Sequence, residues 1–148
     1  FERGDQRYFF VPCKSCLTMQ RLRFKGENEE TNKKFGLVWE TDEAGALVPG
    51  TTRYLCSHCG FAHRNADKAY MLPRGEWRPT AKPRNPEHRS YHISALYSPV
   101  GMFAWDDMVR DWLEAWDVEA SRPRSVGALQ EFYNNFFLTK SELLDRQF

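Results

Sequence analysis

The sequence predicts an α+β fold, in which a small antiparallel β lobe is followed by a helical hairpin. Two Cys-x-x-Cys pairs among short β-prone runs indicate the lobe, and an apolar stripe of helical period indicates the hairpin. A proline-rich segment lies between the two patterns. We therefore divide the chain into a lobe over residues 1–72, a basic connector over residues 73–89 and a helical region over residues 90–148.

Short strands are expected along the lobe. Residues 8–11 are β-prone and end at Pro12, and residues 19–24 alternate between apolar and polar side chains, as a half-buried strand does. The remaining expected elements are strands at 36–40 and 53–55, loops at 25–34 and 41–50, and a short helix at 66–72.

The connector is marked by four prolines, Pro73, Pro79, Pro83 and Pro86. Proline lacks a backbone N–H and fixes φ, so we expect no regular structure here. A strand is expected next, at residues 90–94, before the sequence changes to a helical period.

Two helices are expected in the last third of the chain. Ser125 follows Pro123 and is the expected N-cap of the second helix. The apolar stripe of the first helix consists of Trp105, Met108, Val109, Trp112, Leu113 and Trp116, and the shared face of the second consists of Leu129, Phe132, Tyr133 and Phe136.

The four cysteines, Cys13, Cys16, Cys56 and Cys59, have the spacing of a tetrahedral metal site. Each Cys-x-x-Cys turn presents two thiolates to one ion, and two such turns complete the shell of a structural Zn²⁺. Gly60 would allow the tight backbone that follows the second pair. The lobe is therefore predicted to be zinc-ribbon-like, with extra strands in the long segment between the pairs.

Two alternatives to four-cysteine coordination remain at this point. The cysteines would also allow disulfides or a redox pair, although the flanking pattern is not the βαβ pattern of redox motifs. His58 or His63 would also serve as a zinc ligand in place of a cysteine. Four thiolates leave no open position for water, so the zinc is expected to be structural rather than catalytic.

Composition and charge narrow the function classes. The chain of 148 residues is 41% hydrophobic with a net charge of +1, so any binding of nucleic acid depends on a local patch. That patch is the connector, which contains two acidic residues and five basic ones: Arg74, Arg78, Lys82, Arg84 and Arg89. We expect weak, non-specific contacts with double-stranded DNA there. No apolar run is long enough to predict a membrane span.

No catalytic residue is assigned from the sequence. Asp106, Asp107 and Asp111 resemble a nuclease cluster, but their positions off the apolar stripe are typical of a solvated helix face. No GxxxxGK[ST] loop is present to hold a nucleotide. The chain begins without methionine, and we expect it to be a piece of a longer protein.

Read in order, the motifs resemble the lambda-like (GpA) family of phage terminase large subunits over nearly the whole chain. The run Asp5-Gln6-Arg7-Tyr8-Phe9-Phe10-Val11-Pro12-Cys13 opens the series, which continues with Leu37-Val38-Trp39-Glu40, Tyr54-Leu55-Cys56-Ser57-His58-Cys59-Gly60, Lys68, Met71-Leu72, Gly75-Glu76-Trp77 and His92-Ile93-Ser94-Ala95-Leu96-Tyr97-Ser98-Pro99. Asn135 departs from the family's aromatic-x-Asn-Thr region, and the usual Leu-Gly-Glu-Pro does not follow.

The resemblance implies a segment between or after the packaging ATPase and into the nuclease region. The parent would translocate and cut viral DNA in the bacterial cytoplasm, with the small terminase subunit and the portal as partners. Its Walker motifs would lie upstream of Phe1, and its nuclease carboxylates mostly downstream of Phe148. The segment itself would position DNA or, alternatively, dock a packaging partner through Trp and Phe side chains without touching DNA.

Overall fold

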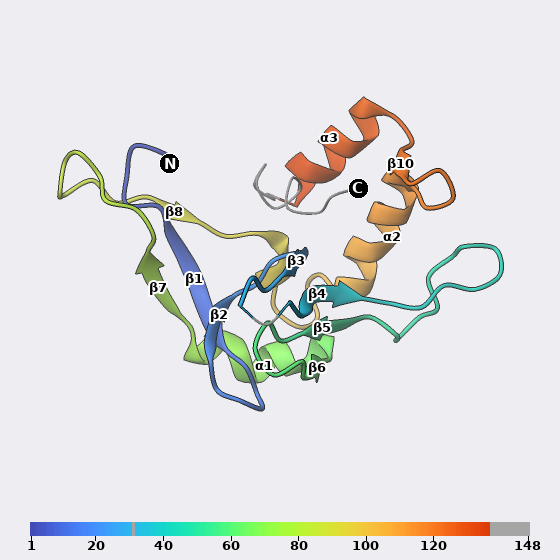
Figure 1. Cartoon of the computed structure of the whole chain (residues 1–148), viewed down its shortest axis with the longest axis horizontal. Coiled ribbons are helices and arrows are strands. Elements are labelled where there is room, and N and C mark those ends of the chain that lie inside the picture. The colour runs from blue at the N-terminus through green and yellow to red at the C-terminus, as the bar shows by residue number, and fades with distance from the viewer. Residues whose placement is uncertain (31, 137–148) are drawn as a thin grey trace.

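A computed structural model describes residues 1–30 and 32–136, and it shows an α+β fold with two small sheets and a few helices (Figure 1). In the first sheet, β1 (Arg7–Pro12) is central. On one side it pairs antiparallel with β7 (Glu76–Pro79). On the other, β2 (Met19–Arg21) pairs antiparallel with the second half of β1, and β8 (Tyr91–His92) pairs parallel with the first half.

The second sheet is antiparallel throughout and has the order β3-β4-β5-β6. Its strands are β3 (Lys25–Glu27), β4 (Lys34–Val38), β5 (Arg53–Leu55) and β6 (Ala62–His63). Three short helical turns follow it: η1 (Asn65–Asp67), α1 (Lys68–Met71) and η2 (Leu72–Arg74). The helix expected at residues 66–72 is thus present.

Two longer helices complete the described chain. They are α2 (Trp105–Ala115) and α3 (Val126–Asn135), and the turn η3 (Ala95–Tyr97) precedes them. A two-stranded ribbon of β9 (Trp116–Asp117) and β10 (Arg122–Pro123) joins the two helices. The Ser125 hydroxyl accepts a hydrogen bond from Ala128 N, so the predicted N-cap is confirmed. The side chain of Tyr133, predicted on the apolar face of α3, lies outside the described part.

One hydrophobic core includes side chains from both sides of the predicted connector. Val11 and Phe24 from the first half are fully buried in the same cluster as Trp105 and Met108 of α2. Phe24 lies against Trp112, with ring centroids 5.3 Å apart. The apolar stripe predicted for the first helix is therefore the face that α2 packs into this core, except that the helix ends at Ala115 and Trp116 reaches the core from β9.

The expectation of irregular structure at residues 73–89 is wrong for Glu76–Pro79, which form β7. This strand lies at the edge of its sheet, where a proline at the end of a strand removes no interior hydrogen bond. The loop expected at 25–34 is also shorter, because β3 begins at Lys25. In the part of the chain that the structure describes, no helix combines the length and apolar character that crossing a bilayer requires.

Candidate metal centre

The two Cys-x-x-Cys segments fold into the same hydrogen-bonded turn. Cys13 N donates to Thr18 O, and Leu17 N donates back to Cys13 O, both at 3.0 Å. The second turn repeats this pattern, because Cys56 N donates to Phe61 O and Gly60 N donates to Cys56 O. We call these two turns the knuckles, residues 13–18 and 56–61.

The knuckles bring four sulfur atoms together. Cys13 Sγ lies 3.6 Å from Cys59 Sγ, and Cys16 Sγ lies 3.7 Å from Cys56 Sγ. All four sulfurs lie within 4.8 Å of one another, and all four cysteines are free rather than disulfide-bonded. A tetrahedron of thiolates around Zn²⁺ at about 2.3 Å has sulfur–sulfur edges of about 3.8 Å. The observed distances fit such an ion.

Backbone amides point at the first sulfur of each knuckle. Ser15 N and Cys16 N lie 3.3 and 3.4 Å from Cys13 Sγ. His58 N and Cys59 N lie at the same distances, 3.3 and 3.4 Å, from Cys56 Sγ. Donors directed at sulfur stabilise a thiolate, which is the form that binds a metal.

The pKa values of the thiols differ with their surroundings. Cys13 is fully buried, and burial raises the pKa of its thiol to about 12. Cys16 lies at the surface, where burial also acts to raise its pKa, but hydrogen bonding with Thr18 outweighs this and lowers the pKa to about 6. The pKa of Cys56 is lowered too, because the amides of its knuckle outweigh its burial.

Gln20 is a supporting residue that the sequence analysis did not identify. It is buried on β2, and its amide nitrogen donates to Cys56 Sγ at 3.2 Å. Its carbonyl oxygen accepts from the backbone N–H and the hydroxyl of Ser57, each at 3.1 Å. One signal was available in the sequence: a polar residue at a position where the alternation of the strand points inward.

Neither histidine weighed as an alternative ligand belongs to the cysteine cluster. His58 is exposed, whereas His63 is fully buried on β6. The Nε2 atom of His63 accepts from Lys14 N at 3.1 Å, and its Nδ1 lies 3.1 Å from Tyr54 O. His63 therefore connects the first knuckle to the second sheet, and burial lowers its pKa, which favours the neutral ring.

The basic residues predicted to contact DNA fall into two groups. Arg74 donates to Tyr70 O and lies over the ring of Tyr70, and Arg78 is paired with Glu76 on the same strand. The other three are exposed on the loop between β7 and β8, residues 80–90, which we call the basic loop. They are Lys82, Arg84 and Arg89.

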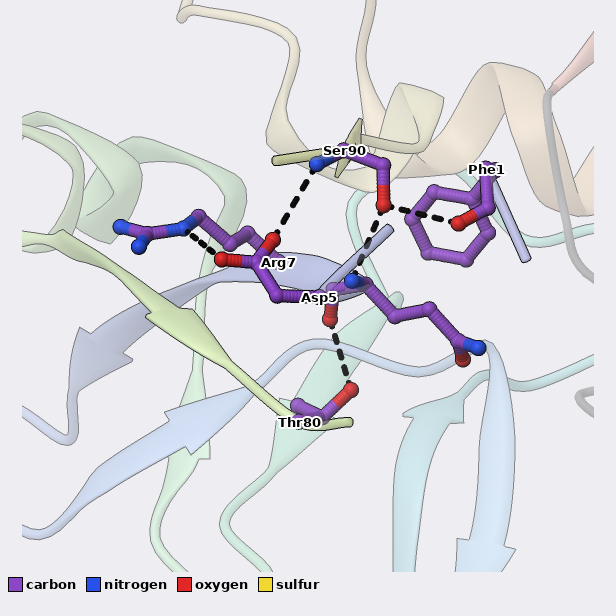
Figure 2. Close-up of polar contacts among 6 residues, drawn as sticks. Phe1, Asp5, Arg7, Thr80 and Ser90 are labelled. Atoms are coloured by element: carbon purple, nitrogen blue, oxygen red, sulfur yellow. Dashed lines mark hydrogen bonds and ion pairs between the residues drawn. The ribbon is translucent and has the colours of Figure 1, made fainter. Parts of the chain in front are cut away.

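A polar cluster fixes the C-terminal end of the basic loop to the beginning of the chain (Figure 2). The Asp5 carboxylate accepts from Ser90 N at 3.1 Å and from Arg7 Nε at 2.7 Å. The Ser90 hydroxyl donates to Phe1 O at 2.8 Å and accepts from Gln6 N at 2.9 Å. Hydrogen bonds from Arg7 and Ser90 keep the pKa of Asp5 below its ordinary value, against the opposing effect of burial.

The other end of the basic loop is attached to the same turn. Thr80 N and Ala81 N both donate to Asp5 O at 3.0 Å, and the Thr80 hydroxyl donates to Gln6 O at 2.6 Å. Asp5 N in turn donates to His88 O at 3.1 Å. Both ends of the loop are therefore fixed, and its basic side chains are presented from a defined position.

Two carboxylates at the start of α2 have local partners. Asp106 accepts from Gly50 N, and Asp107 accepts from Ala104 N at the start of the helix and pairs with Arg110. These are the contacts of a helix N-terminus and its surface. Within residues 1–30 and 32–136, the cysteine cluster is the only group of three or more close metal-ligating side chains.

Fold and site together define an α+β protein with a four-cysteine candidate metal centre. The family model for the ATPase domain of phage terminase large subunit gpA matches residues 1–77, just over half of the 148 residues. The chain therefore belongs to the gpA family of phage terminase large subunits. The match extends through both knuckles. The knuckles therefore lie within the region that matches the ATPase domain, rather than in a segment that follows that domain. Searches of the curated proteins and of the solved structures find no match.

Proposed function

We propose that the two knuckles hold one structural Zn²⁺ in a zinc-ribbon-like lobe of a DNA-packaging terminase large subunit. The observation that carries this proposal is the sulfur cluster, whose edges of 3.6 and 3.7 Å match those of a tetrahedral thiolate site. Four thiolates also suit iron in the same geometry, and the identity of the metal is therefore part of the test.

The zinc would stabilise the fold rather than take part in a reaction. Four cysteines occupy the whole coordination shell, and a catalytic zinc needs an open position. Binding would connect the end of β1 to the end of β5, because the first knuckle follows β1 and the second follows β5. Structural zinc contributes about 10–16 kcal/mol, comparable to the stability of a whole domain.

Elemental analysis of the purified chain tests this part. We expect about one zinc per chain. Cys56→Ser should remove the metal and speed hydrogen exchange in residues 1–72 more than in α2, whereas the control Ser15→Ala keeps the backbone donor and the metal. Iron in place of zinc would correct the identity of the metal. A folded protein without metal, or a mass that shows two disulfides, would refute the site.

The basic loop would position DNA through its phosphates. Lys82, Arg84 and Arg89 are exposed at fixed positions, whereas Arg74 and Arg78 already have partners within the chain. A few phosphate contacts give dissociation constants of about 10⁻⁴–10⁻⁶ M at physiological salt, with little preference for sequence.

Fluorescence anisotropy with a labelled duplex tests this contact. Replacing the three basic residues of the loop by alanine should reduce the slope of log K against log salt by about two to three. A duplex that does not bind at low salt, or a slope that the triple variant leaves unchanged, would refute the DNA contact. The matched control removes the same charge elsewhere: Lys34, Arg64 and Arg122.

The alternative is a protein-docking module that presents aromatic side chains to the small terminase subunit or the portal. The structure disfavours most of the candidate tryptophan anchors, because Trp105, Trp112 and Trp116 are only 1%, 5% and 7% exposed. For the parent we propose ATP-driven translocation, to which residues 1–77 would contribute as part of the ATPase domain, together with DNA cleavage. Both would take place in the host cytoplasm with both partners, as the family implies.

A further inference from the structure

The first sheet carries exposed aromatic side chains at the end that extends beyond the core. Trp77 on β7 and Tyr91 on β8 are 36% and 53% exposed, and their ring centroids lie 5.1 Å apart at an interplanar angle of 89°. The strand register places Trp77 opposite Phe9 and Tyr91 opposite Arg7. Directly opposed residues, and residues two apart on β1, share a face, so these side chains form one surface.

This surface, which we call the aromatic strip, is a continuation of the core. Val11 on the same face of β1 is fully buried, and the Phe9 ring lies 5.3 Å from Trp77 and 5.8 Å from Tyr97. The Tyr97 hydroxyl is itself fixed, because it donates to Phe9 O and accepts from Leu22 N. Trp77 is therefore held by packing from below while part of its surface stays open.

The charges beside the strip decide what kind of ligand it suits. The Arg7 guanidinium lies 6.0 Å from the centroid of the Tyr91 ring but is paired with Asp5. The net positive charge beside the strip therefore comes from the basic loop, which runs directly from β7 to β8. Glu87 is the one acidic residue in that loop. Positive charge around two perpendicular rings disfavours a cationic ligand, which aromatic cages otherwise bind, and favours a polyanion.

We propose that the aromatic strip binds unpaired nucleotides of a DNA strand, with bases stacked on Trp77 and Tyr91 and phosphates held by the basic loop. Aromatic side chains beside a basic track are the general means of binding single strands, because every base offers a π face. A duplex keeps its bases stacked inside, so it would use the loop alone. The inference rests on the proposed DNA contact for its phosphate-binding part and adds a second, base-dependent part.

Three labelled probes of twelve nucleotides separate the two parts in anisotropy titrations: oligothymidylate, an abasic strand with the same phosphates, and a duplex. Stacking is worth about 1–3 kcal/mol per base, so Trp77→Ala should weaken oligothymidylate binding about 5- to 150-fold. The same variant should leave the abasic strand and the duplex within about twofold of the wild type. Trp77→Phe keeps a ring and should restore most of the affinity.

Two further variants keep the test decisive. Tyr91→Ala changes a more exposed side chain and should show the same selective loss even if Trp77→Ala loosens the sheet. Met102→Ala, at 78% exposure in the loop before α2, removes a large exposed apolar side chain elsewhere and should not change binding. If both strip variants bind oligothymidylate as the wild type does, the strip is a protein-docking face and the inference is wrong. Loss of duplex binding in the triple loop variant would still support the DNA contact by itself.

Discussion

Lys68 gives the sharpest prediction about stability, because a lysine is fully buried in the core. Its Nζ donates to Phe103 O at 3.1 Å and lies 4.9 Å from the centroid of the Trp105 ring. Burial lowers the pKa of Lys68 from 10.5 to about 8, and Asp107 opposes this only in part. A difference of that size corresponds to about 3 kcal/mol between the two protonation states.

The sign of the pH dependence follows from proton linkage. Between pH 8 and 10.5 the unfolded chain keeps the Lys68 proton and the folded chain releases it, so the free energy of unfolding rises with pH. We expect the wild type to gain about 3 kcal/mol across this window relative to Lys68→Met. Below pH 8 both states carry the proton, and the difference between the two proteins becomes constant.

Urea denaturation of the metal-loaded chain at several values between pH 7.5 and 10.5 measures this difference. Exposed Lys34→Met is the matched control and should follow the wild type. Other groups titrate in this range, but they are common to all three proteins and cancel in the comparison. Parallel curves for the wild type and Lys68→Met would show that burial does not perturb this lysine.

Three other predictions concern the knuckles and the polar cluster. Leu17 and Gly60 occupy equivalent positions after the second cysteine of each knuckle, with φ of 62° and 77°, and Leu17 is 61% exposed. In urea denaturation, Leu17→Gly should therefore raise the free energy of unfolding by about 0.5–1 kcal/mol, and Gly60→Ala should lower it by about 1 kcal/mol. Gln20→Leu removes the donor to Cys56 and should weaken zinc about 10- to 100-fold in chelator competition, while the chain stays folded. Asp5 has a folded pKa below 3.8, so its contribution to stability is lost as pH falls through that pKa. In denaturation experiments between pH 3 and 6, Asp5→Asn should lose less free energy of unfolding on acidification than the wild type. An equal loss in both proteins would contradict the assigned hydrogen bonds.

The sequence was sufficient for features that local patterns determine. The Cys-x-x-Cys spacing predicted the sulfur cluster, the helical stripe predicted α2, and Ser125 predicted the start of α3. The helix, its N-cap and each separate knuckle depend on residues within a few positions of one another, and the meeting of the two knuckles was predicted from the need of one metal ion for four thiolates. Pairing between distant segments left no comparable local signal.

The pairing of β7 with β1 shows why the rest was out of reach. Trp77 finds its partner in Phe9, and three of the surrounding prolines still mark the loop and turns beside the strand rather than its interior. The buried Lys68 and the sulfur contact of Gln20 likewise depend on tertiary packing, which overrides the usual exposure of polar residues. Composition alone treated the five basic residues of the connector as equivalent, although Arg78 is occupied by Glu76.

The position of the knuckles also affects how the chain can fold. The central strand β1 is among the first residues of the chain, yet its partner β7 comes only after the whole second sheet. A metal held by both knuckles shortens the path between these strands by roughly two-thirds, which lowers the entropic cost of closing the loop by about 1 kcal/mol. We therefore expect the metal-free chain to refold more slowly. In this arrangement the ion would act as a shortcut along the chain, allowing the first sheet to close before the intervening segment is fully ordered.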